Sequence, residues 1–139
     1  MIDVKELRVG NLVLGYYAYN DENDQEQEIT SVCRVLSIDS VGAHEYPLWV
    51  EAIGKANNVE EYDGFVAIPL TEEWLLRFGF EKRNDSNFWL DGFCLKAYDN
   101  EFYVLTEQKR VFIEFVHTLQ NLYFSLKGEE LELTSSPEQ

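Results

Sequence analysis

Four side chains are of the kinds that bind zinc or act as a nucleophile and its base: Cys33, His44, Cys94 and His117. A zinc site needs ligands in closely spaced pairs, and a cysteine nucleophile needs a neighbouring base oriented by a third group. The four residues stand far apart with no such spacing, so we expect neither a zinc site nor a Cys–His pair. Both cysteines lie in apolar runs, which predicts reduced thiols packed in strands. His117 is expected to cap or pack at the start of a helix, and His44 to lie in an exposed loop.

The densest group of carboxylates is the segment Asn20–Glu28, which reads NDENDQEQE. In an EF-hand register that starts at Asp21, Glu26 stands where glycine makes the turn, and Val32 stands where a glutamate binds calcium through both oxygens. The calcium-loop interpretation therefore fails. Weak divalent-cation binding and a solvated loop stay open as alternatives.

Carboxylates are too numerous for their number to indicate catalysis. With 26 Asp and Glu in 139 residues, some pair lies at a glycosidase-like separation by chance. The 8 glycines match neither a phosphate-binding loop nor a dinucleotide fingerprint. We therefore expect no nucleotide or other cofactor and no catalytic residue.

The chain is strongly acidic, because 11 Lys and Arg against 26 Asp and Glu give a formal net charge of −15. Nucleic-acid binders gain affinity from clustered Lys and Arg, and anionic membrane surfaces attract the same residues. Direct nucleic-acid or membrane binding is therefore not expected. No apolar run approaches the ~18 residues of a membrane span. The charged start Met1–Arg8 is unlike a signal peptide, so we expect a cytoplasmic protein.

Aromatic residues make up 14% of the chain and are the one enrichment that favours recognition. Consecutive aromatic residues on a strand point to opposite faces, so one of each pair leaves the core. Tyr17, in the run Tyr16–Tyr19, and Trp89, after Phe88, are the candidates for an outward position. Such a ring either packs under a helix or forms part of an interface.

Short β-rich runs dominate the first half of the chain. Four strands are predicted, at Asn11–Tyr19, Ser31–Ile38, Leu48–Ile53 and Gly64–Ile68. The polar segments Asn20–Glu28 and Asn57–Gly64 are predicted to be exposed loops.

The pattern changes to helix after Pro69. Thr71 is a good N-cap for a helix over Glu72–Phe78, which Gly79 can end in a left-handed conformation. A meander is predicted next, with strands Asn87–Leu90, Phe93–Tyr98 and Phe102–Thr106 separated by Asp91-Gly92 and Asp99-Asn100 turns. The stretch 110–127 fits either one continuous helix or a strand Arg110–Phe115 followed by a helix Val116–Lys127 that Gly128 ends. Its β-branched and aromatic residues favour the strand.

These elements predict an α+β fold: an N-terminal bent antiparallel sheet or small barrel, then a helix, a β-meander and a C-terminal helix packed on the sheet. The length fits one compact domain over residues 1–134, with a β-rich half (1–70), a helix–strands–helix half (71–134) and a frayed tail (135–139). The layer between helices and sheet is expected to contain Trp74, Leu75, Phe78, Leu119, Leu122, Tyr123 and Leu126.

Three segments resemble those of one protein family. IPLTEEWLLRFGFEK (Ile68–Lys82) and VHTLQNLYFSLKGEEL (Val116–Leu131) are similar to the signature stretches of a family of short proteins of unknown function, common in Bacteroidetes genomes and their phages and mobile elements. ELRVGNLVL (Glu6–Leu14) resembles that family's usual start. The resemblance implies a bacterial or phage origin and this order of elements. It transfers no site residue, because the family has no assigned activity or ligand.

The lack of a catalytic pattern and the surplus of strand aromatics lead to three hypotheses of function. The first is a non-enzymatic module that binds another protein, with a homo-oligomer also open. The second is an acidic inhibitor or nucleic-acid mimic whose carboxylates occupy the phosphate-binding groove of a basic partner. The third is a small enzyme of unrecognised type, which needs a deep pocket with converging polar groups. The candidate partner-binding residues are Asp21, Glu22, Asp24, Glu26, Glu28, Tyr17 and Trp89.

Overall fold

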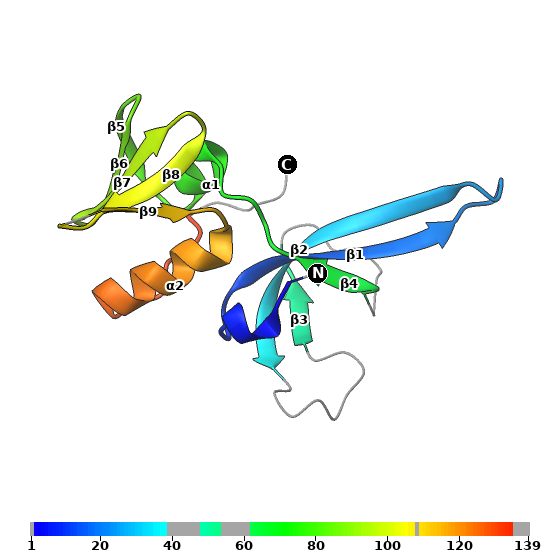
Figure 1. Ribbon diagram of the computed structural model, residues 1–139. Helices are drawn as coiled ribbons and strands as arrows, with labels where there is room; N and C mark the ends of the chain where they lie inside the picture. The colour runs from blue at the N-terminus through cyan, green and yellow to red at the C-terminus, as the bar shows by residue number, and fades with distance from the viewer. Residues whose placement is uncertain (1, 39–47, 54–61, 108, 135–139) are drawn as a thin grey trace. The chain divides into compact units, whose positions relative to one another are not determined.

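The computed structural model describes residues 2–38, 48–53, 62–107 and 109–134 (Figure 1). These residues form two compact units, and the chain passes from the first to the second between Ile68 and Pro69, close to the division predicted at residue 70. The first unit contains a four-stranded antiparallel sheet, and the second contains a five-stranded antiparallel sheet with two helices. The predicted α+β class is confirmed. That the two halves make one domain stays a prediction.

The first sheet has the strand order β3-β2-β1-β4. Its unit comprises η1 (Val4–Glu6), β1 (Leu12–Asn20), β2 (Glu26–Ile38), β3 (Leu48–Ala52) and β4 (Gly64–Val66). Pairings among the described residues make this an open sheet rather than a barrel. Val13, Cys33 and Val35 alternate along β1 and β2 into a core that also contains Tyr62 and Phe65. Tyr62 covers Gly15 so closely that a Cβ atom there would stand 2.8 Å from its ring.

The β1–β2 hairpin has a shorter turn than predicted. The sequence predicts a loop over Asn20–Glu28, but β1 continues to Asn20 and β2 begins at Glu26, so only residues 21–25 form the turn. The loop prediction was wrong because polar side chains argue against burial and not against strand pairing. A two-stranded ribbon exposes both of its faces, so polar residues fit it as well as they fit a loop.

The second sheet is a meander with the strand order β5-β6-β7-β8-β9. Its unit comprises α1 (Glu72–Arg77), β5 (Glu81–Asn84), β6 (Asn87–Leu90), β7 (Phe93–Tyr98), β8 (Glu101–Leu105), β9 (Arg110–Ile113) and α2 (Val116–Lys127). The Thr71 cap of α1 and the strand-then-helix interpretation of residues 110–127 are confirmed. Asp91-Gly92 and Asp99-Asn100 adopt the positive φ that two-residue hairpin turns require. β5 was missed because all its residues are exposed and show no apolar alternation.

Both helices contribute buried side chains to the core of the second unit. The ring of Tyr123 lies 5.5 Å from that of Phe93, and that of Phe80, just after α1, lies 6.1 Å from the same ring. Most of the predicted layer is confirmed as buried: Trp74, Leu75, Phe78, Leu119 and Tyr123. No helix among the described residues has the length and apolar character needed to cross a membrane.

The end of α2 departs from the prediction. Leu122 is half-buried, and Leu126 is 63% exposed, so its place in the layer was wrong. The last turn of α2 lies beside the polar β6–β7 turn, where the Lys127 ammonium donates to the Asp91 carbonyl oxygen at 2.7 Å. That neighbour offers no apolar cover, so the buried stripe of α2 ends at Tyr123.

Leu119 and Leu126 give a matched test of this packing. We expect Leu119→Ala to lower the free energy of unfolding by about 2–5 kcal/mol, because it removes methyl groups from a fully buried site. Leu126→Ala should change it by no more than about 0.5 kcal/mol. Urea unfolding followed by tryptophan fluorescence measures both, and equal losses in the two variants would contradict the placement of α2.

Candidate functional site

The outer part of the β1–β2 hairpin, residues 17–30, extends beyond the first sheet as a two-stranded ribbon, which we term the arm (Figure 1). β4 pairs with β1 only over Leu14–Tyr16, and β3 pairs with β2 only from Cys33 onward. Within the described ranges, therefore, no strand pairs with the outer edge of Tyr17–Asn20 or of Glu26–Thr30. The arm presents two strand edges and two faces to its surroundings.

Asp63 fastens the base of the arm. Its backbone N–H donates to the Tyr16 carbonyl oxygen at 2.7 Å, and its carboxylate accepts from the Ala18 N–H at 2.8 Å. The edge of β1 is thus held for two residues beyond the end of β4 pairing. From Tyr19 outward, the arm is held by the pairing of β1 with β2 and by its own turn.

Asp21 organises the tip of the arm. Its carboxylate accepts hydrogen bonds from the backbone N–H groups of Asn23 and Gln25 at 2.9 and 3.0 Å, and from the Gln27 side-chain amide at 3.1 Å. These bonds stabilise the charged form of Asp21 and lower its pKa below the ordinary value, and the bond from the Gln25 N–H has the largest effect. Among the candidate partner-binding residues, Asp21 therefore has an evident structural task.

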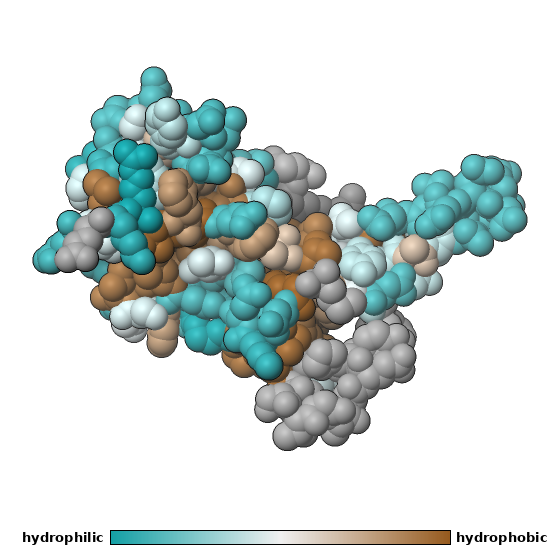
Figure 2. Space-filling view, in the orientation of Figure 1, coloured by the Kyte–Doolittle hydropathy of each residue, from teal (hydrophilic) through white to brown (hydrophobic). Residues whose placement is uncertain are grey.

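The other four carboxylates of the arm, those of Glu22, Asp24, Glu26 and Glu28, are exposed. The sequence contains no Lys or Arg between Arg8 and Arg34, so no base of this stretch offsets their charge. Figure 2 shows hydrophilic residues covering the outer part of the arm. Charged side chains at open strand edges disfavour pairing with another strand, so a partner would meet the side chains of the arm rather than extend its sheet.

One face of the arm carries an aromatic pair. Tyr17 is opposite Ile29 and Tyr19 is opposite Gln27, so these four side chains share a face. The rings of Tyr17 and Tyr19 stack with their centroids 6.1 Å apart and their planes at 16°. Sequence reasoning chose Tyr17 and missed Tyr19 and Ile29, although strand alternation predicts that Tyr17 and Tyr19 lie on the same side.

The hairpin brings together six of the seven candidate residues, and Trp89 is the exception. Trp89 lies on β6 of the second unit, where the Arg83 guanidinium stands 4.7 Å from its ring centroid. It is half-buried rather than fully outward.

The cysteines and His117 occupy packing positions. Cys33 is buried in β2, and burial raises the pKa of its thiol, whereas Cys94 is half-buried in β7. His117 is buried at the start of α2, with its ring stacked on that of Phe115 at 5.7 Å. The described residues contain no group of three or more His, Cys, Asp or Glu placed to hold a metal ion. His44 and residues 57–61 of the second predicted loop lie outside the described residues.

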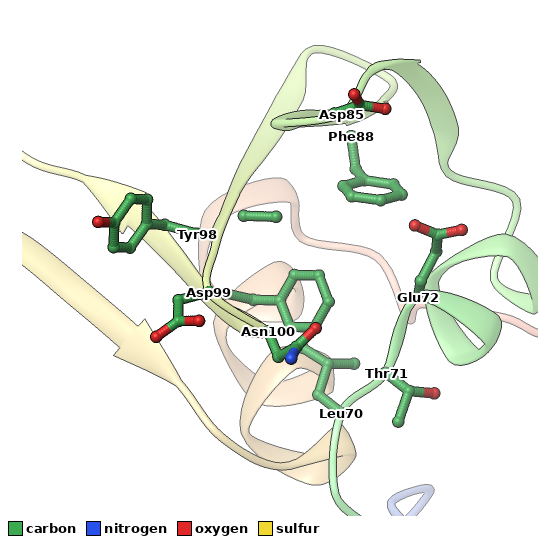
Figure 3. Close-up of a pocket in the computed structure, with 10 residues that line it drawn as sticks. Leu70, Thr71, Glu72, Asp85, Phe88, Tyr98, Asp99 and Asn100 are labelled. Atoms are coloured by element: carbon green, nitrogen blue, oxygen red, sulfur yellow. The ribbon is translucent and has the colours of Figure 1, made fainter.

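The second unit has an open groove of about 530 Å³ (Figure 3). Buried Phe88 and Phe102 line it together with the carboxylates of Glu72, Asp85 and Asp99. Figure 3 shows Glu72 reaching toward the Phe88 ring while Asp99 points away from it. Glu72 is also bound to the Lys82 ammonium at 2.9 Å. The carboxylates face different directions, unlike the pair that flanks the scissile bond in glycoside hydrolysis.

Comparison with known proteins gives no guide to the role of either surface. No family model, no curated protein and no solved structure matches this chain. The resemblance to the Bacteroidetes and phage family stays a prediction.

The tip of the arm can be tested through Asp21. We expect Asp21→Ala to lower the protection factors of the amides of residues 23 and 25, because both lose their acceptor. Amide exchange measured by NMR checks this, with Glu22→Ala as the control. In the wild type, protection should persist at pH values where an ordinary aspartate, with pKa about 3.9, is half protonated. It should vanish as the pH falls through the lower pKa of Asp21, because stability gained from a lowered pKa is lost on protonation. Unchanged protection in Asp21→Ala would exclude this turn.

Thiol labelling tests the second strand of the hairpin. We expect Cys94 to react with a maleimide well before Cys33, because Cys33 is fully buried and its raised pKa leaves little thiolate. Mass spectrometry after brief exposure should find one modification, at Cys94. Cys94→Ser should remove the fast reaction, and fast labelling of Cys33 in that variant would contradict its burial.

Proposed function

We propose that this protein is a non-enzymatic protein-interaction module, bacterial or phage-encoded and cytoplasmic, whose arm binds a basic surface of another protein. The arm is the observation that carries the proposal. It extends past the core of its sheet with exposed carboxylates, no basic residue and a stacked tyrosine pair. Ordering such a ribbon costs conformational entropy, and the ribbon buries too little apolar area to offset that cost. The length of the arm is therefore not explained by the stability of the sheet.

The chemistry of the arm favours a partner rich in Lys and Arg. Four exposed carboxylates attract cations over roughly the Debye length, about 8 Å at physiological ionic strength, and speed the encounter. At contact, the exposed ring of Tyr19 offers a face on which a guanidinium or ammonium group can pack. Carboxylates supply the charge attraction, and the aromatic face supplies area that excludes water.

The two free cysteines support a reducing compartment. Cys33 is packed as a small apolar side chain in the core of the first unit, and Cys94 is a free thiol of the second unit. Thiols persist in this state where cellular reductants keep them reduced, which is the situation of the cytoplasm.

A nucleic-acid mimic is the second candidate, favoured by the spacing of two carboxylates. Glu26 and Glu28 lie on the same face of β2, separated by two strand steps or about 6.8 Å. The charges of one duplex strand recur about every 3.4 Å along its axis and also wind around it, so the distance between neighbouring phosphates exceeds 3.4 Å and a carboxylate pair at this separation suits two phosphates of one strand. Competition decides between the candidates, because a mimic and duplex DNA should exclude each other from the same partner.

The proposal can be tested by affinity capture from a bacterial lysate at low salt. We expect the wild type to retain a basic protein that elutes as the salt concentration rises. The arm variant Glu22→Gln, Glu26→Gln, Glu28→Gln should lose about tenfold or more of that affinity. The control Glu107→Gln, Glu129→Gln, Glu132→Gln removes the same charge from exposed positions of the second unit and should bind as the wild type does. Asp21 is kept in both because it holds the turn.

Two outcomes would overturn the proposal. Equal capture by the arm variant and the wild type would show that the arm is not the contact. Equal loss in the arm variant and the control would show that net charge alone governs binding.

A further inference from the structure

The five-stranded sheet has a second face, opposite to the one that buries Phe88, Leu95 and Phe102. Register and strand alternation also place polar and apolar residues of β5 to β9 on it. We use the term open face for this side of the sheet, and the residues that matter here are Arg83, Trp89, Cys94, Lys96, Tyr103, Arg110 and Phe112. Phe112 is 53% exposed. The sequence reading singled out one member, Trp89, and missed the others, which lie apart along the chain.

Rings and cations alternate across the open face. The Arg83 guanidinium stands 4.7 Å from the Trp89 ring centroid, and that of Arg110 stands 5.0 Å from the Tyr103 ring centroid. The Tyr103 and Phe112 rings are 5.5 Å apart. A guanidinium stacked on a ring keeps its N–H edge available, and that edge matches the two oxygens of a carboxylate.

The charge of this face is opposite in sign to that of the chain. Three basic residues lie on this face, and two acidic residues, Glu81 and Glu101, lie on it as well. The local charge is therefore +1, whereas the whole chain carries −15. Glu81 is already paired with Arg83, at 3.7 Å. Within the described ranges, no carboxylate lies within 4.0 Å of the charged group of Lys96 or Arg110. The open face therefore suits an occupant that carries carboxylates together with aromatic rings.

We propose that the open face binds the arm of a second copy of this chain. The arm carries what the face lacks: exposed carboxylates on a ribbon without bases, with Glu26 and Glu28 on one side of the ribbon and the stacked rings of Tyr17 and Tyr19 on the other. The inference rests on the proposed function, because it assigns to the same arm one basic partner surface. An arm-to-face contact is heterologous, so it closes as a dimer only when two copies exchange arms reciprocally, and otherwise builds longer chains.

A single-stranded nucleic acid is the competing occupant, since aromatic and basic sheet faces stack bases. The net charge of −15 opposes it, because a long polyanion meets the field of the whole protein. The same field repels a second copy, which also carries −15, so the contact has to be local. The arm brings its carboxylates within a Debye length of the three bases and keeps the contact short. Charge complementarity therefore favours the arm.

Sedimentation velocity on two charge-reversed variants tests the proposal. The arm-reversed variant carries Glu22→Lys, Glu26→Lys and Glu28→Lys, and the face-reversed variant carries Arg83→Glu and Arg110→Glu. We expect the wild type to associate as its concentration rises, more weakly at high salt, and each variant alone to associate about tenfold or more weakly. An equimolar mixture of the two variants should restore association, because each supplies the surface complementary to the other. Lys5→Glu with Lys109→Glu, a control of the same charge change as the face-reversed variant, should behave as the wild type.

Cys94 gives a second readout on the open face, directly opposite Trp89 in the register. We expect maleimide labelling of Cys94 to slow several-fold as the wild-type concentration rises and to stay constant in the face-reversed variant. Slowing in both proteins alike would overturn the proposal.

Three results, two from sedimentation and one from a nucleic-acid binding assay, would overturn the inference. The wild type could stay monomeric at all concentrations while its arm still captures a basic protein. That result would exclude a second copy as the occupant of the open face and would leave the proposed function intact. Association that both variants retain places the contact elsewhere. Binding of a labelled oligothymidylate by the wild type, lost in the face-reversed variant, makes the open face a nucleic-acid platform instead.

Discussion

The antiparallel pairing of β1 with β2 is the constraint on which the first unit depends. The ladder runs without interruption from Leu12 opposite Arg34 to Asn20 opposite Glu26. Its inner end lies in a core around Val13 and Cys33, and its outer end forms the arm. Because side chains alternate with a period of two, a slip of one residue would expose the core residues and move Tyr17 to the other face. Burial at one end of the ladder thus determines which side chains the arm presents at the other.

The same alternation divides the second sheet into two chemically different faces. Phe88, Leu95 and Phe102 are buried on one face. On the other face, Arg83 and Arg110 lie over the rings of Trp89 and Tyr103. A guanidinium covers an aromatic ring without removing its own charge from water, so the open face combines partly covered rings with exposed cations.

Net charge describes this protein incompletely. The value of −15 governs solubility and long-range encounter, and it disfavours polyanionic partners. Contacts are governed by charges within about a Debye length of each other. On that scale the acidic and basic residues of this chain are separated: the arm has no basic residue, and the open face has three. An acidic composition is therefore compatible with two surfaces of opposite charge on one chain.

Local physical chemistry in the sequence determined the α+β class, most strands, the Thr71 cap and the positive-φ turns, since each depends on residues a few positions apart. The acidic candidates were found for the same reason, because one hairpin carries them all. Tertiary structure alone decided the strand character of β5, the reach of the β1–β2 ladder, the exposure of Leu126 and the grouping of the open face. Each of these features depends on which distant segment packs against the residues concerned. Polar residues alone do not decide it, because they are compatible with a paired ribbon as well as with a loop. The residue pattern of one segment does not specify which distant segment packs against it, and that packing decides which of its side chains are buried.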